Sequence, residues 1–139
     1  MSLVLASPEA AAATSRPVVS FRVCRSQAGP LYHQLSLQDD QGDRAHWIVP
    51  VPLKQLAKSP ALLWQLPPTG ALGALTCLDT GAMRLAPAHP GTRPDLRADL
   101  AEGTLRLHFE GQVLRGYFRL HCLPEGSGQL WQLIPIGHV

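Results

Sequence analysis

The stretch LYHQLSLQ alternates polar and apolar side chains, which is typical of a β-strand with one buried face. Tyr32, Gln34 and Ser36 fall on one face of this strand, and Leu35 and Leu37 fall on the other. Polar groups held on a rigid strand can orient a ligand or take part in catalysis. This polar face is therefore the first candidate for chemistry.

His33 lies in the same stretch, at a position that alternates with the polar face. Because neighbouring strand residues point to opposite faces, we expect His33 to point inward and to be a structural, hydrogen-bonded histidine. A slipped strand or a bulge would instead return it to the polar face, where it could act as a ligand.

A divalent-metal site is the alternative chemistry near this strand. The residues concerned are His33 in the strand, Asp39 and Asp40 in the turn that follows it, and His46 after the turn; imidazole and carboxylate groups suit ions such as Mn²⁺. The acidic turn nevertheless lacks the ligand spacing of a Ca²⁺-binding loop. We expect no metal and no cofactor, with Mn²⁺ only if these four residues form a rebuilt site.

The cysteines and the scattered histidines show no spacing that suggests a metal site. The cysteines lie far apart, and we expect small apolar thiols in or near strands, in a reducing compartment. We expect the histidines at the surface or rim of the fold. The residues concerned are Cys24, Cys77, Cys122, His46, His89, His108, His121 and His138.

A second candidate site lies in TLRLHFEGQVLRGYFRLHCL, which reads as two alternating strands joined by a Glu-Gly-Gln turn. Basic side chains share its outer face, namely Arg106, His108, Arg115, Arg119 and His121. Such a face can contact a phosphate backbone, and Tyr117 could stack on a base. A solvated sheet face with Glu110 as counter-charge is the simpler interpretation, and we favour it. The candidate nucleic-acid contacts are Arg106, Arg115, Tyr117 and Arg119.

Short strands joined by tight turns must position both candidate sites. We expect strands at 18–23, 31–38, 46–51 and 61–66, within 75–87 on either side of an Asp-Thr-Gly turn, within 104–123, and at 130–136. One short helix is expected over LRADLAE, between an N-cap at Asp95 and a stop at Gly103. PLKQLAKSP can form a single helical turn at most. The pattern predicts an all-β fold, a compact antiparallel β-barrel of about seven or eight strands with one short helix.

The chain of 139 residues is sized for one domain. We expect a flexible N-terminal segment over 1–16 and the β-barrel domain over 17–139. The formal net charge of +2 excludes a strongly basic nucleic-acid-binding protein unless the charge is clustered. The sequence shows no signal-peptide core and no stretch of ~20 apolar residues, so we expect a cytoplasmic protein without a membrane partner.

In this order, the segments resemble the 3′-phosphoesterase domain found at the N-terminus of bacterial ATP-dependent DNA ligase D and in stand-alone proteins. That family carries H-Y-D-(L/F)-R-L-E, a turn and W-A-V-P, where this chain reads YHQLSLQ, a turn and WIVP. The family's G-x-Y-G-x-G and W-D-x-G correspond to GALGA and LDTG. Its closing segments correspond to LAEGTLRLHF, GQVLRGYFRLH and LWQLIPI. The resemblance covers roughly residues 18–136 and is most specific in the last strands.

The resemblance implies a manganese-dependent phosphoesterase site, built on the outward face of H-Y-D-x-R, on a histidine just before it and on a V-E-D-H-P segment. Alignment on the buried strand positions places Ser26, Tyr32, Gln34 and Ser36 at the former-site positions. None of them is a good manganese ligand, and none carries positive charge. The V-E-D-H-P segment has no counterpart, because LWQL passes through PPTG almost directly into GALGA. We therefore expect no catalytic residues.

The sequence leads to three hypotheses of different classes. The first is a catalytically degenerate relative of the ligase D domain, a binding or scaffold module linked to DNA-end repair, whose partner is a repair protein or a nucleic-acid end. The second is a divergent metal-dependent 3′-phosphoesterase that acts on DNA or RNA ends with a rebuilt site. The third is an oligomeric structural or interaction protein that uses apolar residues such as Trp64 as an interface. We favour the first.

Overall fold

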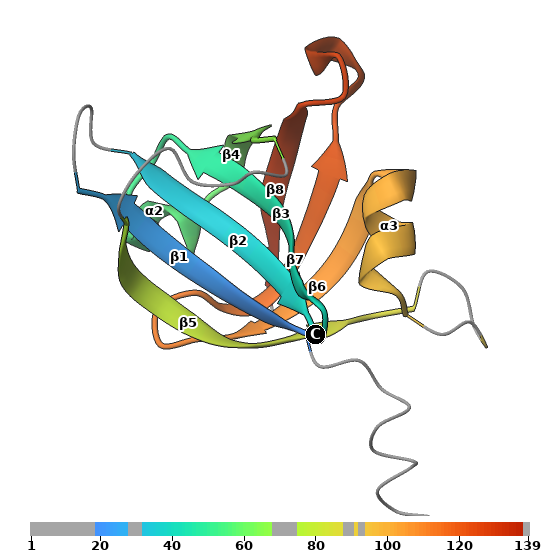
Figure 1. Cartoon of the computed structure of the whole chain (residues 1–139), viewed down its shortest axis with the longest axis horizontal. Helices are drawn as coiled ribbons and strands as arrows, with labels where there is room; N and C mark the ends of the chain where they lie inside the picture. The colour runs from blue at the N-terminus through green and yellow to red at the C-terminus, as the bar shows by residue number, and fades with distance from the viewer. Residues whose placement is uncertain (1–18, 28–31, 68–74, 88–90, 92–93, 138–139) are drawn as a thin grey trace, which may run out of the picture.

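The computed structural model describes residues 19–27, 32–67, 75–87, 91 and 94–137 (Figure 1). Among these residues, no helix combines the length and the apolar character needed to cross a membrane. Outside them lie the predicted flexible segment 1–16, the GALGA stretch, His89 and His138.

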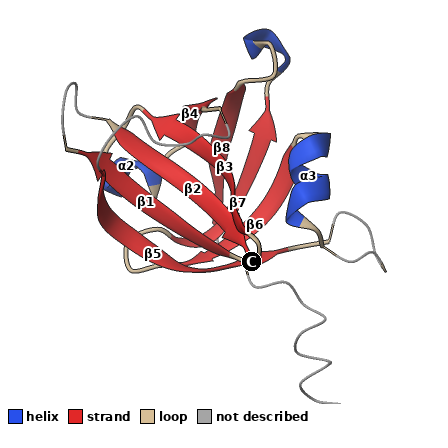
Figure 2. Cartoon of the chain, in the orientation of Figure 1, coloured by secondary structure: helices blue, strands red, loops and turns tan. Residues whose placement is uncertain are grey.

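Antiparallel strands of the described chain close into a barrel in the order β1-β2-β3-β4-β8-β7-β6-β5. Figure 2 shows that strands make up most of the regular structure. The structure thus confirms the predicted all-β barrel. The strands are β1 (Ser20–Ser26), β2 (His33–Asp39), β3 (Gly42–Val49), β4 (Ala61–Gln65), β5 (Leu75–Leu85), β6 (Thr104–Glu110), β7 (Arg115–Cys122) and β8 (Leu130–Gly137).

The predicted helix is present as α3 (Leu96–Glu102), which lies outside the barrel beside β6 (Figure 1). Asp95 caps its first turn, because its Oδ1 accepts a hydrogen bond from the backbone N–H of Arg97 at 3.1 Å. Gly103 ends it with a φ of 86°, a left-handed conformation that glycine adopts without strain. Two single turns complete the described helical structure: α2 (Leu53–Leu56) and the 3₁₀ turn η1 (Pro124–Gly126).

Strand β5 differs from the sequence-based prediction. It runs without a break over 11 residues, so the expected Asp-Thr-Gly turn is wrong. The Asp79 carboxylate accepts hydrogen bonds from four backbone N–H groups, that of Leu114 at 2.8 Å among them. The Thr80 hydroxyl donates to the carbonyl oxygen of Phe21 at 2.8 Å. These contacts with distant residues hold turn-forming residues in an extended conformation.

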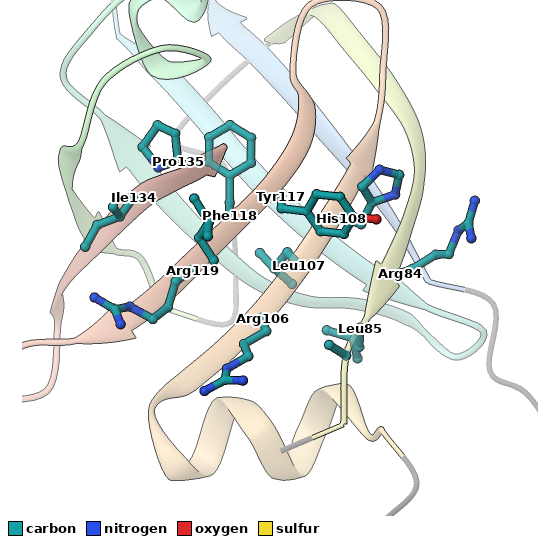
Figure 3. Close-up of a pocket in the computed structure, with 12 residues that line it drawn as sticks. Arg84, Leu85, Arg106, Leu107, His108, Tyr117, Phe118, Arg119, Ile134 and Pro135 are labelled. Atoms are coloured by element: carbon teal, nitrogen blue, oxygen red, sulfur yellow. The ribbon is translucent and has the colours of Figure 1, made fainter. Parts of the chain in front are cut away.

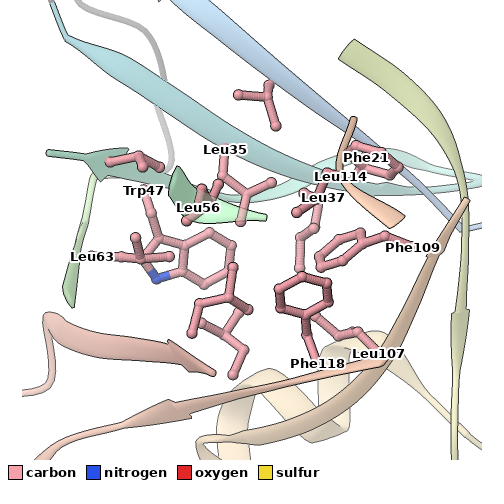
Figure 4. Close-up of a cluster of buried hydrophobic side chains, with 14 of the residues drawn as sticks. Phe21, Leu35, Leu37, Trp47, Leu56, Leu63, Leu107, Phe109, Leu114 and Phe118 are labelled. Atoms are coloured by element: carbon pink, nitrogen blue, oxygen red, sulfur yellow. The ribbon is translucent and has the colours of Figure 1, made fainter. Parts of the chain in front are cut away.

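Aromatic and aliphatic side chains fill the barrel interior (Figure 4). The Phe109 ring packs edge-on against Phe21, with ring centroids 4.9 Å apart, and against Phe118 at 5.3 Å. Trp47 and Trp131 pack edge-on at 5.5 Å. The alternation in the last hairpin correctly predicted its core positions, all of which are buried. They are Leu105, Leu107, Phe109, Leu114, Phe118 and Leu120.

Candidate functional site

The first candidate site is the outer face of β2, which carries Gln34 and Ser36, two of the four former-site positions. Leu35 and Leu37 belong to the barrel core, so Gln34 and Ser36 point away from it. The register of the β2–β3 hairpin places His46 directly opposite Ser36. The outer face of this hairpin therefore joins His46 to the two polar residues.

Gln34, Ser36 and His46 form one hydrogen-bonded group, the Ser36–His46 cluster. Ser36 Oγ lies 2.7 Å from His46 Nδ1, and Gln34 Nε2 lies 3.2 Å from Ser36 Oγ. The Ser36 hydroxyl accepts from the Gln34 amide, whose Nε2 also lies 3.3 Å from His46 Nδ1. The cluster is buried, since Gln34 and Ser36 are each 1% exposed and His46 is 5% exposed.

Among the described residues, two buried polar atoms have no hydrogen-bond partner: Gln34 Oε1 within the cluster and the hydroxyl oxygen of Tyr32, two residues before Gln34. The backbone of Tyr32 is held by Ser26, whose Oγ accepts a hydrogen bond from the Tyr32 N–H at 2.9 Å. Buried polar atoms without partners are uncommon in folded proteins. The described part of the barrel thus leaves two hydrogen-bonding atoms here without a partner.

The structure brings the former-site positions together in two pairs. Gln34 contacts Ser36, and Ser26 contacts the backbone of Tyr32. His46 joins the first pair, and its predicted place at the surface or rim is wrong. Alternation along β3 signals that His46 points outward, but only the strand register shows that it meets Ser36.

The four residues of the alternative metal site do not come together. Asp39 accepts a hydrogen bond from the backbone N–H of Gln41 within the β2–β3 turn, and Asp40 is exposed in that turn. His46 belongs to the Ser36–His46 cluster, and His33 begins β2 at the far end of the strand. In the described part of the chain, no group of three or more His, Cys, Asp or Glu side chains could hold a metal ion.

His33 lies on the same side of β2 as Leu35 and Leu37, in agreement with the alternation of the sequence. It is half-buried, and burial, followed by the nearby Arg25 guanidinium, lowers the pKa of its imidazole. Within the described ranges its side chain makes no hydrogen bond, so the predicted bond is not found there.

The second candidate site is an open groove of about 670 Å³ on the outer face of β5, β6, β7 and β8 (Figure 3). We call it the basic groove. Side chains from four strands line it, including Arg84, Arg106, His108, Tyr117, Arg119 and Ile134. Three of the four predicted nucleic-acid contacts therefore meet in one depression. The fourth, Arg115, lies opposite Glu110 and outside the groove lining.

Arg106 and Arg119 are direct cross-strand partners in the basic groove. Beside them, the His108 and Tyr117 rings lie with centroids 4.5 Å apart and planes tilted by 40°. The groove thus combines two guanidinium groups with an aromatic pair, and Tyr117 is 45% exposed. This is the composition of a surface that binds phosphate groups and stacks a flat ring.

Glu110 forms ion pairs with Arg84 and His108 at the groove but none with the Arg106–Arg119 pair. Its Oε2 accepts a hydrogen bond from Arg84 Nε at 2.5 Å and lies 3.5 Å from His108 Nδ1. The Arg84 hydrogen bond, more than the His108 contact, lowers the pKa of the Glu110 carboxyl. The ion pairs of the described groove residues are those of Glu110, and neither Arg106 nor Arg119 takes part in them.

Two parts of the basic groove were not predicted from the sequence. Arg84 lies in the segment after the expected Asp-Thr-Gly turn, which was not predicted to continue the same strand. The apolar contribution of Ile134 and Pro135 comes from β8, which follows β7 in the chain and pairs with it through a register shift. The alternation of Met83 and Arg84, one buried and one exposed, is the signal that could have added Arg84.

No protein-family model matches the chain, and no curated protein matches it.

Proposed function

We propose that this protein is a catalytically inactive relative of the ligase D 3′-phosphoesterase domain that binds a single-stranded nucleic-acid end through its basic groove. The observation that carries the proposal is the cross-strand Arg106–Arg119 pair beside the stacked His108 and Tyr117 rings. The link to DNA-end repair rests on the resemblance of the sequence to that family.

The arginine pair supports an anionic ligand. Like charges directly opposite each other on a sheet destabilise the fold, and no carboxylate of the described groove neutralises this pair. A phosphate group can accept hydrogen bonds from both guanidinium groups, and such charge-assisted bonds are stronger than neutral ones. Arg106 and Arg119 therefore repel each other in the free protein and become partners of one phosphate in the complex.

The aromatic pair supports a nucleotide rather than a free anion. Tyr117 is exposed over nearly half of its surface, with its ring held against His108. Stacking of a base on an aromatic side chain contributes about 1–3 kcal/mol and tolerates every base. A phosphate on the arginines with its base on Tyr117 would use both features of the groove at once.

The low net charge of +2 sets the expected strength of binding. Only a few phosphates can be neutralised, so the affinity should be modest. The logarithm of the binding constant should fall with the logarithm of the salt concentration, with a slope of about −0.7 for each phosphate neutralised on a single strand. A protein with so low a net charge can bind nucleic acid only where its basic residues are clustered, and the basic groove supplies such a cluster.

The test is fluorescence anisotropy of a labelled single-stranded DNA oligonucleotide at low salt. The Arg106→Ala, Arg119→Ala double variant should bind at least roughly ten-fold more weakly than the wild type. The matched control removes two exposed lysines at α2, Lys54→Ala and Lys58→Ala, and should bind like the wild type. Equal losses in both variants would mean that general charge, not the groove, attracts the oligonucleotide.

A divergent phosphoesterase is the second candidate function. The Ser36–His46 cluster favours it, because it places a histidine on the face where the resemblance puts the catalytic residues. It ranks second because the cluster is buried whereas the basic groove is open. Its test is 3′-phosphatase turnover with excess Mn²⁺ on a 3′-phosphorylated primer, against an active family member and a His46→Ala variant. Turnover that the variant loses would establish this function in place of the first.

A further inference from the structure

Cys24 on β1 and Cys77 on β5 are direct cross-strand partners. Both are free thiols, but their environments differ. Cys24 is buried, with 6% of its surface exposed, whereas Cys77 is exposed to solvent. All three cysteines lie in strands, as predicted, but the thiol of Cys77 is exposed rather than packed among apolar side chains. Neither thiol belongs to the basic groove or to the Ser36–His46 cluster.

Because of a register shift in the β1–β5 ladder, the Cys24 and Cys77 side chains lie on the same face of the sheet. Val23 pairs with Asp79, and the next β1 residue, Cys24, pairs with Cys77, so Leu78 is an extra residue on β5. In an unbroken strand Cys77 would share the inward side of the buried Asp79. The bulge at Leu78 shifts this alternation by one residue and leaves Cys77 exposed beside Cys24.

The cross-strand position fits the geometry of a disulfide. Direct partners in an antiparallel ladder have Cα atoms about 4.5 or 5.5 Å apart. A disulfide accepts Cα separations of about 4.4–6.8 Å. We propose that Cys24 and Cys77 form a reversible disulfide by exchange with a low-molecular-weight disulfide of the glutathione class.

The exchange takes place in two balanced steps. The Cys77 thiolate attacks one sulfur of glutathione disulfide, which gives a mixed disulfide on Cys77 and releases one glutathione thiolate. The Cys24 thiolate then attacks the Cys77 sulfur, forms the Cys24–Cys77 bond and releases the second glutathione thiolate. In sum, two protein thiols are oxidised to one disulfide and one glutathione disulfide is reduced to two thiols.

The different exposure of the two cysteines assigns their roles. Cys77 meets the reagent, because it is the exposed partner, and Cys24 resolves the mixed disulfide from its buried position. Burial, together with the neighbouring Cys77 thiol, raises the pKa of the Cys24 thiol. The second step should therefore speed up as the pH rises towards 9, because more of Cys24 is then thiolate.

The bond would close the barrel covalently. The β1–β5 ladder is the seam that joins the first strand of the barrel to the last one in the strand order. A disulfide there links two strands that are far apart in the sequence, and cross-links of this kind restrict the unfolded chain most. Oxidation should raise the Tm of the protein by at least about 5 °C.

The experiment treats the folded full-length protein with glutathione disulfide, counts free thiols and maps disulfides by mass spectrometry of non-reduced peptides. The wild type should lose two of its three thiols, yield the Cys24–Cys77 peptide pair and regain all thiols with dithiothreitol. The control Cys122→Ser, which removes the cysteine outside the pair, should form the same bond. The variant Cys24→Ser should stop at a glutathione adduct on Cys77.

Two results would overturn the proposal. One is a stable glutathione adduct on wild-type Cys77 without the intramolecular bond, even at pH 9. The other is a Cys24–Cys77 bond that appears only after the protein has been unfolded in urea, since the folded ladder would then not hold the thiols in bonding geometry. If the Cys24–Cys77 bond forms and the Tm does not rise, the bond does not stabilise the β1–β5 pairing as proposed.

Discussion

Arg106 of β6 and Arg119 of β7 stand directly opposite each other in the basic groove, without an ion pair to either among the described residues. The arrangement costs folding free energy and supplies a phosphate site. A protein under selection for stability alone has no reason to keep it, so the pair links the electrostatics of the sheet to the proposed function.

The Arg119→Glu variant should therefore be more stable than the wild type by roughly 0.2–1 kcal/mol and should lose oligonucleotide binding. Replacing repulsion by attraction across the β6–β7 ladder is the physical reason. Urea unfolding at low salt measures the stability. The matched variant Arg115→Glu places two carboxylates opposite each other at Glu110 and should be destabilised. Both differences should shrink in 1 M salt, and differences that persist there would argue against an electrostatic origin.

The Asp79→Asn variant should lose about 2–3 kcal/mol of unfolding free energy, because the carboxylate accepts four backbone hydrogen bonds that an amide cannot fully replace. Asp40→Asn, in the exposed β2–β3 turn, is the control and should change stability little. Chemical unfolding at pH 7 provides the comparison.

The same carboxylate predicts a pH dependence. Burial alone raises the pKa of Asp79, but the backbone hydrogen bonds from Leu114, Gln112, Val113 and Thr80 outweigh it, so the folded-state pKa lies below the ordinary value of 3.8. The unfolded chain therefore takes up the proton more readily. The stabilisation by ionised Asp79 is present above about pH 4 and is lost as the pH falls through the folded-state pKa. The Asn variant should lack this part of the acid sensitivity, and an unchanged acid profile would contradict the assignment.

For Asp99 in α3 we predict the opposite change of stability with pH. Burial, followed by the nearby Glu102 and Asp95 carboxylates, raises the pKa of Asp99 above 3.8. The folded protein thus holds this proton more tightly than the unfolded chain, so ionisation lowers stability as the pH rises through that range. Asp99→Asn should have a larger free energy of unfolding than the wild type at pH 7 and show no such gain at pH 3. A destabilised variant at pH 7 would reveal a favourable partner of the carboxylate.

The Ser36→Ala variant should lower the free energy of unfolding by about 1–3 kcal/mol, because it removes two buried hydrogen bonds and leaves only the longer 3.3 Å contact between Gln34 Nε2 and His46 Nδ1. Thermal or urea unfolding measures the loss. Ser20→Ala, which removes a partly buried hydroxyl bonded to Gln38 at 3.2 Å, is the control and should cost less. Equal costs would mean that the cluster adds nothing beyond one ordinary hydrogen bond.

The sequence was sufficient to predict the barrel and the elements whose signals are local. Asp95 and Gly103 mark the ends of α3, and alternation identifies the core faces of the last hairpin. These signals succeed because capping and strand periodicity depend on residues a few positions apart. The same alternation predicted that Arg106, Tyr117 and Arg119 share one outer face, and the structure places all three in the basic groove.

The remaining features depend on contacts between distant parts of the chain. The Asp-Thr-Gly residues form a strand because Asp79 binds the backbone near Leu114, which no local pattern indicates. His46 is buried and contacts Ser36 across the hairpin, and alternation distinguishes inward from outward but not buried from exposed. The shape of the groove likewise needs the register of β5 and β8 against the last hairpin.

The most direct test of nucleic-acid binding through the basic groove is a ¹H–¹⁵N NMR titration with a short single-stranded DNA. We predict the largest shift changes at the amides around Arg106, His108, Tyr117 and Arg119, with little change along β2 and β3. Changes centred on Gln34, Ser36 and His46 would instead assign the ligand to the Ser36–His46 cluster. No saturable change anywhere at low salt would contradict the proposed function itself.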